Sequence, residues 1–272
     1  MPQSSDLRVP VYGLDGTKKK EVKLPRVFSE QLEPELIERA VLSIQSAAKQ
    51  RQGTKPRAGR DNTAEYRAVR ALPTVDRGIN IGRARLPRLK NRRLHISGRV
   101  AGIPRAVGGP KAHPPKSEKK IVEKINKKEK RKALKSALAA TALKKLVLAR
   151  HVVERDMPVP VVVEDDFGEL SRTKDVLKAF KAVGIAPDLE NAKKKTKKKS
   201  GKGKRRGRSK KKKKSVLIVT VEKKPVYKAA RNLTGVNITT LKELNADMLA
   251  PGGVPGRLAV FTESAIAELE KW

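Results

Sequence analysis

The stretch VLIVTV at residues 216–221 is the clearest strand signal in the chain. Unbroken β-branched and aliphatic runs of this length are typical of strands buried on both faces of a parallel sheet. Three shorter apolar runs share this character and are predicted strands, at residues 159–163, 236–240 and 258–262. Apolar residues at helical spacing predict helices at residues 173–183, 226–233, 241–249 and 263–271.

This alternation of strands and helices predicts an α/β fold: a three-layer sandwich with a mainly parallel central sheet. Helices must cover both faces of such a sheet, because its strands are apolar on both sides. Gly184 stands directly after the helix at 173–183, where glycine commonly ends a helix in the left-handed conformation.

The N-terminal part of the chain predicts a hairpin followed by a helix. Residues 7–12 and 21–24 are predicted as two short strands joined by a turn at 14–16. Residues 34–48 place apolar side chains at helical spacing and are predicted as a helix. Further on, Ser117 predicts the start of a short helix that carries Ile121 and Ile125. A longer helix is expected at 130–146, preceded by Asn126 and Glu129 at capping-box spacing.

The positive charge of the chain is concentrated in two segments. The formal net charge is +37, and residues 49–116 hold 18 Lys and Arg against three acids. Residues 193–214 hold 16 Lys and Arg and no acid. Charge of this density opposes compact folding unless a polyanion neutralises it, and nucleic acid is the usual partner because each phosphate contact releases counterions.

We therefore predict a globular α/β domain formed by residues 1–48 and 117–272, with two cationic segments inserted in it. The basic loop, residues 49–116, has eight Gly, seven Pro and one aromatic residue, Tyr66. It is too poor in apolar residues to fold alone and is expected to be mobile without a partner. Folded back on itself, it reaches at most on the order of 110 Å. The basic insertion, residues 193–214, is low in complexity and repels itself.

The sequence gives no sign of an enzyme. It has no cysteine, and its three histidines, His95, His113 and His151, are scattered. The glycines at 201–207 lie in a lysine tract and those at 252–256 precede a strand, so neither group fits a phosphate-binding loop. Residues 164–166 (EDD) follow a strand without a visible catalytic partner. We expect no catalytic residue, metal, cofactor, small-molecule substrate, signal peptide or membrane span.

Several stretches together resemble the universal large-subunit ribosomal protein four family, in its archaeal and eukaryotic form. They occur in the family's order and cover nearly the whole chain: AHPPK at 112–116, SALAATA at 136–142, PVVVEDD at 160–166, SGKGKRR at 200–206, KAARNLTG at 228–235, LAPGGVPGRL at 249–258 and VFTES at 260–264. At the entry of the basic loop, Gly59 and residues 63–66 also match, as do residues 78–87. Residues 67–77 depart from the family's pattern.

The resemblance implies a structural constituent of the large ribosomal subunit, located in the cytoplasm. It implies that the chain binds large-subunit ribosomal RNA, supports early assembly and contacts neighbouring ribosomal proteins. It also implies that the tip of the basic loop, about residues 67–97, lines the polypeptide exit tunnel and meets the nascent peptide. A DNA-compacting protein and an RNA-acting α/β enzyme are the alternatives, but no DNA-reading helix, carboxylate cluster or cofactor loop is visible.

The expected contacts with RNA phosphates are cations spaced along the two basic segments. Arginine suits this role because its planar group binds phosphate through two donors at once. In the basic loop the candidates are Arg57, Arg60, Arg83, Arg85, Arg88, Lys90, Arg92, Arg93, Arg99, Arg105, Lys111, His113 and Lys116. In the basic insertion they are Lys202, Lys204, Arg205, Arg206 and Arg208.

Overall fold

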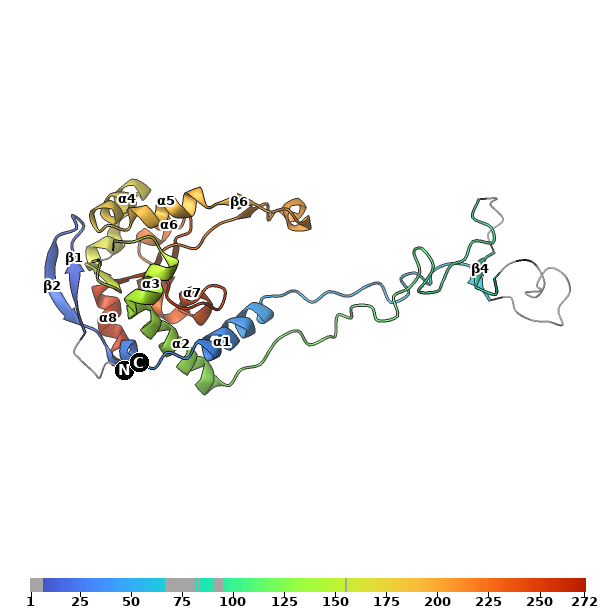
Figure 1. Ribbon diagram of the computed structural model, residues 1–272, viewed down its shortest axis with the longest axis horizontal. Coiled ribbons are helices and arrows are strands. Elements are labelled where there is room, and N and C mark those ends of the chain that lie inside the picture. The colour runs from blue at the N-terminus through green and yellow to red at the C-terminus, as the bar shows by residue number, and fades with distance from the viewer. Residues whose placement is uncertain (1–6, 67–81, 83, 91–94, 155) are drawn as a thin grey trace. The chain divides into compact units, whose positions relative to one another are not determined.

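A computed structural model describes residues 7–66, 82, 84–90, 95–154 and 156–272 of the chain (Figure 1). The chain forms two compact units, one made of Met1–Ala48 and Glu123–Trp272 and the other of Lys49–Val122. Residues 117–122, which were expected in the globular domain, thus belong to the second unit. The basic insertion lies within the first unit.

A six-stranded sheet forms the centre of the first unit, in the order β2-β1-β5-β10-β8-β9. Only β2 runs antiparallel, paired with β1 at one edge, and every other neighbouring pair is parallel. This confirms the predicted α/β class and the mainly parallel sheet. The strands are β1 (Arg8–Tyr12), β2 (Lys18–Lys23), β5 (Val161–Val163), β8 (Leu217–Thr220), β9 (Asn237–Thr240) and β10 (Ala259–Thr262).

The central strands are buried on both faces, as the apolar run at 216–221 predicts. Leu217 and Val219 of β8 contribute to one hydrophobic cluster, while Ile218 between them contributes to the other. In the neighbouring strand, Phe261 and Val260 divide in the same way. This division follows from the two-residue period of a strand, so a single apolar run supplies two separate cores.

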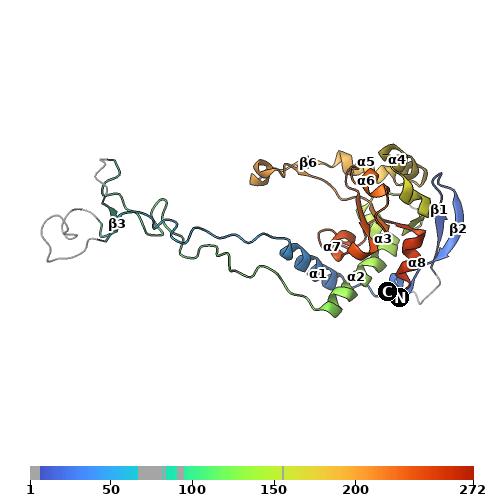
Figure 2. The same cartoon turned by 180° about the vertical axis from the view of Figure 1, so that it is seen from behind.

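Helices cover both faces of the sheet and complete the three layers. One face carries α1 (Pro34–Ala47), α2 (Lys127–Ala142), α7 (Ala246–Leu249) and α8 (Glu263–Leu269). The other carries α4 (Thr173–Ala182), α5 (Ala186–Lys194) and α6 (Val226–Ala230), and Figure 2 shows the same division from behind. Shorter 3-10 turns are η1 (Arg26–Ser29), η2 (Asp165–Glu169) and η4 (Leu241–Glu243).

The predicted helix at 130–146 is wrong as a single element. It is α2 followed by α3 (Lys144–Arg150), with extended backbone at Leu143 (φ −83°, ψ 97°) between them. Leu138 of α2 packs in one core, and Val147 of α3 packs in the other. The break lets consecutive helical turns serve opposite faces of the sheet. The predicted capping box is confirmed, since the Asn126 N–H lies 3.4 Å from Oε2 of Glu129.

The short helix predicted from Ser117 is absent, and residues 119–126 form no helix or strand. The backbone here is bound by side chains of α1 instead of by its own helical hydrogen bonds. The Ser46 hydroxyl accepts the Glu123 N–H at 2.9 Å, and the Ser43 hydroxyl donates to the Glu123 carbonyl at 2.7 Å. Ile125 of this segment packs against the hydrophobic cluster that contains Leu217 and Leu138.

One further predicted helix is divided in the structure, and one observed helix was not predicted. The predicted helix at 241–249 is divided into η4 and α7, because Asn245 is extended and its side chain accepts the Met248 N–H as the cap of α7. Helix α5 was not predicted, since lysines hide its short apolar face. Pro187 in its first turn and the buried Leu189 and Ala192 three residues apart are the signals that identify it.

The second unit is held together mainly by backbone contacts between its outgoing and returning segments. Strands β3 (Ala64–Glu65) and β4 (Arg88–Leu89) pair antiparallel, and the Thr54 N–H donates to the Pro115 carbonyl at 3.2 Å. Pro110 is the one buried residue among those described between 49 and 122. A unit with so little burial gains little hydrophobic stabilisation, as its composition predicts.

Candidate nucleic-acid interface

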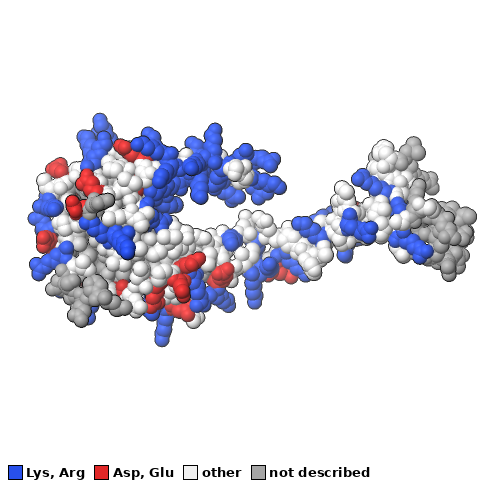
Figure 3. All heavy atoms as spheres, viewed as in Figure 1, with Lys and Arg blue, Asp and Glu red and all other residues white. Residues whose placement is uncertain are grey.

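The basic insertion is a short hairpin with cations at every rung. It contains β6 (Lys197–Lys198), η3 (Lys202–Arg206) and β7 (Lys210–Lys211). Lys197 lies opposite Lys211, and Lys198 lies opposite Lys210. Like charges that face each other across a strand pair destabilise it, so this hairpin gains stability wherever an anion lies between the ammonium groups. Figure 3 shows Lys and Arg covering it.

The five candidate residues of the basic insertion lie on η3 and just after it. Gly207 ends this turn in the left-handed conformation (φ 75°), and the Arg208 N–H returns to the Gly203 carbonyl at 3.1 Å. All five side chains are exposed, and none forms an ion pair with another described residue. The structure brings these candidates together: Lys202, Lys204, Arg205, Arg206 and Arg208.

The candidates of the basic loop are mostly exposed in the second unit. Arg83, Arg92 and Arg93 lie outside the described residues, as does most of the expected loop tip. Arg88 is half-buried, while the others are exposed at intervals along both segments of the unit: Arg57, Arg60, Arg85, Lys90, Arg99, Arg105, Lys111, His113 and Lys116.

Three of the loop candidates have partners inside the unit. Arg88 donates to the Gly98 carbonyl at 2.9 Å and to the Ala84 carbonyl at 3.0 Å, so part of its donor capacity shapes the local turn. Lys90 pairs with Glu65, and Nε of Arg57 lies 3.6 Å from Asp61. Surface pairs of this kind contribute at most ~1 kcal/mol, so a phosphate can replace the carboxylate.

A buried polar network lies where the basic insertion joins the sheet, and it was not predicted. Asp188 of α5 is fully buried, and its carboxylate accepts a hydrogen bond from the Ser215 hydroxyl. It also accepts from Nδ1 of His151 at 2.9 Å and from the Val152 N–H at 3.2 Å. A carboxylate can only accept, so Nδ1 of His151 must carry a proton.

The network shifts the pKa values of both titratable partners downward. Burial raises the pKa of Asp188, but hydrogen bonds from His151, Ser215 and the Val152 N–H more than offset it, so the pKa lies below its usual value. Burial lowers the pKa of His151 despite the hydrogen bond to Asp188. At neutral pH the network therefore holds a carboxylate and a neutral imidazole.

Arg257 is the second buried charge in this region, and it satisfies backbone carbonyls at the end of the sheet. It is 1% exposed and donates to the carbonyls of Ser215 at 2.8 Å and Met248 at 2.7 Å, and to Oδ1 of Asn237 at 2.9 Å. Burial lowers its pKa to about 9, so it stays charged at neutral pH. The sequence signal that could have identified Arg257 is its position directly before an apolar strand.

Residues 252–256 form a turn held by side chains rather than a phosphate-binding loop. Arg150 donates to the carbonyls of Val254 at 2.5 Å and Pro251 at 2.8 Å. Gly252, Gly253 and Gly256 all have positive φ angles, which explains the glycines at these positions. This agrees with the interpretation of the segment as a turn before β10.

The contacts of Ser215, His151 and Asp188 differ from those of a catalytic triad. In a triad, histidine bonds the serine and the acid orients the histidine. Here the serine and the histidine both bond the acid, and Nε2 of His151 is buried without a partner. In this arrangement the Ser215 hydroxyl donates to the Asp188 carboxylate and not to the histidine.

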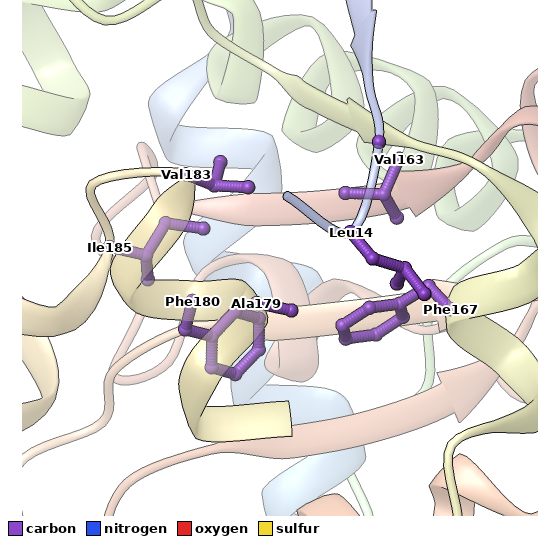
Figure 4. Close-up of a pocket in the computed structure, with 8 residues that line it drawn as sticks. Leu14, Val163, Phe167, Ala179, Phe180, Val183 and Ile185 are labelled. Carbon is purple, nitrogen blue, oxygen red and sulfur yellow. The ribbon is translucent and has the colours of Figure 1, made fainter. Parts of the chain in front are cut away.

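Two hollows lie in the first unit. One is lined mainly by apolar side chains, among them Phe167, Phe180 and Ile185, which Figure 4 draws as sticks. The other lies at the carboxyl ends of β8 and β10 and contains Asp165. The Asp165 carboxylate accepts from the Ser264 N–H at 3.1 Å and hydroxyl at 2.6 Å, and Glu164 pairs with Lys19 at 2.8 Å. Glu164 and Asp165 thus have structural partners.

Over the part of the chain that the structure describes, no three histidine, aspartate or glutamate side chains gather as metal ligands. None of the described helices combines the length and the apolar character needed to cross a membrane.

Comparison with known proteins assigns the family. Residues 22–272 match the model of the "Ribosomal protein L4/L1 family". The large ribosomal subunit protein uL4 of Archaeoglobus fulgidus is 45% identical over 98% of this chain and 99% of its own length. The proteins of the same name from Methanoculleus marisnigri (98% of this chain, 100% of its own length) and Halobacterium salinarum (97% and 99%) are 46% and 40% identical. These matches span both the globular unit and the basic segments, so the chain belongs to the ribosomal protein L4/L1 family.

Proposed function

We propose that the chain is a structural constituent of the large ribosomal subunit and binds large-subunit ribosomal RNA through its two basic segments. The observation that carries this proposal is the basic insertion, in which lysines face lysines across each rung and no acid lies nearby in sequence. Such a hairpin is matched to a phosphate backbone, because phosphates placed between the cations convert repulsion into attraction.

The basic loop supports the same function from a different property. Its described residues bury almost nothing, and its cations are spread along both segments rather than gathered in one patch. An extended chain with glycine and proline stays narrow and follows grooves in folded RNA. Sparse aromatics favour contacts with the backbone over base stacking. We therefore assign all eighteen candidate residues, the three undescribed ones included, to contacts with RNA.

The finer roles follow from family membership and belong to the same proposal. We assign the first unit, Met1–Ala48 and Glu123–Trp272, to the body of the protein, and residues 49–116 and 193–214 to its RNA-binding segments. The tip of the basic loop would line the exit tunnel and meet the nascent peptide, and binding would occur early in assembly. The partners are ribosomal RNA and neighbouring ribosomal proteins in the cytoplasm.

The test compares the affinity of the chain for two polyanions at equal salt concentration. The full chain is titrated with large-subunit ribosomal RNA and with duplex DNA of equal phosphate concentration. Preference for the ribosomal RNA supports the proposal, whereas equal affinity would favour the DNA-compacting alternative. Crosslinking within purified, salt-washed large subunits then identifies the contacting residues, and absence of the protein from those subunits would exclude the proposal.

A further inference from the structure

The basic insertion has no buried residue of its own, so its direction must be set where it joins the body. Residues 193–214 are all exposed or half-exposed. The hairpin bonds, such as the Lys199 N–H to the Ser209 carbonyl at 2.8 Å, hold its two arms to each other but not to the sheet. Its orientation therefore depends on the residues just before and just after it.

The carboxylate of Asp188 joins these two ends. Asp188 lies in α5, which leads into the insertion, and Ser215 is the first residue after it. The buried hydroxyl of Ser215 donates to Oδ2 of Asp188, while Nζ of Lys213 lies 3.7 Å from Oδ1. The helix that leads into the outgoing arm thus holds the base of the returning arm through one buried carboxylate. Hydrogen bonds to a buried charge are among the strongest in a protein.

The returning arm is also fixed to the sheet. The Ser215 N–H donates to the Gly235 carbonyl at 2.8 Å, and Nε of Arg257 donates to the Ser215 carbonyl at 2.8 Å. Oδ1 of Asn237 accepts from Arg257 at 2.9 Å and from Nζ of Lys214 at 3.2 Å. Gly235 (φ 83°) leaves room for this approach, because a Cβ there would lie 2.5 Å from the Lys213 carbonyl oxygen.

We propose that Asp188 and Ser215, supported by Arg257, are positioning residues that clamp the base of the basic insertion and fix the direction in which it presents its cations to RNA. This inference rests on the proposed RNA-binding function. A rigidly directed hairpin increases the effective concentration of its cations at the RNA once the rest of the chain is bound.

The absence of cysteine allows a direct measurement of this direction. Two spin labels are attached through Ser209→Cys near the hairpin turn and Lys178→Cys on α4, both exposed positions of the first unit. Their distance distribution is measured in the free full-length protein. Ser215→Ala removes only the clamping hydroxyl, and Asp188→Asn keeps nearly the same shape. Ser200→Ala is the matched control, because Ser200 is exposed in the same hairpin.

We expect broader distance distributions for Ser215→Ala and Asp188→Asn than for Ser200→Ala, with circular dichroism showing a folded body in each. A distribution unchanged in both clamp variants would overturn the inference, whatever the protein binds. If circular dichroism shows that one clamp variant is unfolded, the comparison is made with the other clamp variant.

The second measurement is affinity for large-subunit ribosomal RNA. Ser215→Ala should weaken binding roughly three- to tenfold, as expected for a lower effective concentration of the insertion. The loss should shrink when the five cations at 202, 204, 205, 206 and 208 have been replaced by Gln, because the clamp then positions only the remaining lysines of the insertion. A loss of undiminished size in that background would overturn the positioning role. Failure of the unaltered chain to bind ribosomal RNA would refute the proposed function instead.

Discussion

Lys198 and Lys210 are register partners in the antiparallel β6–β7 pair, and neither has an acidic neighbour in the insertion. Two ammonium groups facing each other destabilise the free hairpin. The same geometry provides two cations on one rung for a phosphate. A substitution that removes this repulsion should therefore stabilise the hairpin in the free protein and weaken its binding to RNA.

Lys198→Glu tests this opposition. It replaces a repulsive rung by an attractive one, so we expect slower exchange of the Lys199 N–H, which donates to the Ser209 carbonyl in the free protein. RNA affinity should fall about tenfold, since one phosphate contact is lost and a repulsion is added. Lys174→Glu on α4 makes the same change in net charge outside the basic segments, and a comparable loss there would contradict the local role of the rung.

The salt dependence of RNA binding reports how many phosphates are neutralised. If about ten of the candidate cations contact phosphate together, the log–log slope of affinity against salt should be on the order of nine. Filter binding over a range of potassium chloride concentrations measures it. A slope near two would be incompatible with RNA wrapped by both basic segments.

Arg257→Met should destabilise the globular unit by about 3 kcal/mol, because the carbonyls of Ser215 and Met248 lose their donors in a buried place. Urea unfolding of the full chain measures this change in the free energy of unfolding. Arg172→Met, at an exposed position before α4, is the control and should lie within about 0.5 kcal/mol of the unaltered protein.

Because His151 is buried, we expect the globular unit to lose stability in mild acid. Its folded-state pKa lies below the usual 6.5, so below that pH the unfolded chain takes up a proton that the folded chain does not. Stability is complete above pH 6.5 and declines as the pH falls toward the folded value, by up to about 1.4 kcal/mol per pH unit.

Urea unfolding at several pH values between 7.5 and 5 measures this slope. His151→Gln should flatten it, whereas His113→Gln in the exposed basic loop should leave it unchanged. Asp188, whose pKa is also lowered, adds a loss only at lower pH, as the pH falls through its usual value of 3.8 toward its folded value. Equal slopes in the unaltered protein and His151→Gln would contradict the assignment.

Gly109→Ala should disrupt the turn at 103–109 in the second unit. A Cβ at this position would lie 1.9 Å from the Ile103 carbonyl oxygen, which accepts the Ala106 N–H. We expect exchange of the Ala106 amide to accelerate about tenfold or more. Gly108→Ala distinguishes a steric clash from backbone strain. Its φ of +75° is unfavourable for alanine, but no atom lies within 4 Å of the added Cβ. A larger effect at Gly108 would show that backbone strain, rather than the clash, controls this turn.

Elements with a strong local signal were predicted closely. The run at 216–221 supplies β8, and the helix ending at Gly184 supplies α4, because burial on two faces and a glycine stop leave a clear pattern. The errors arose where distant residues decide the backbone. Leu143 breaks a helix to serve two cores, and Ser43 and Ser46 bind the backbone of Glu123 in place of a helix.

The order of residues was enough to predict the α/β class, which the structure confirms, and to locate the two cationic segments. These properties depend on local periodicity and on charge counted along the chain, which do not require knowledge of distant contacts. The buried bonds among Asp188, Ser215, His151 and Arg257 became visible only in three dimensions. Such residues are separated along the chain and carry no shared spacing, so only the folded sheet with α3 and α5 beside it brings them together.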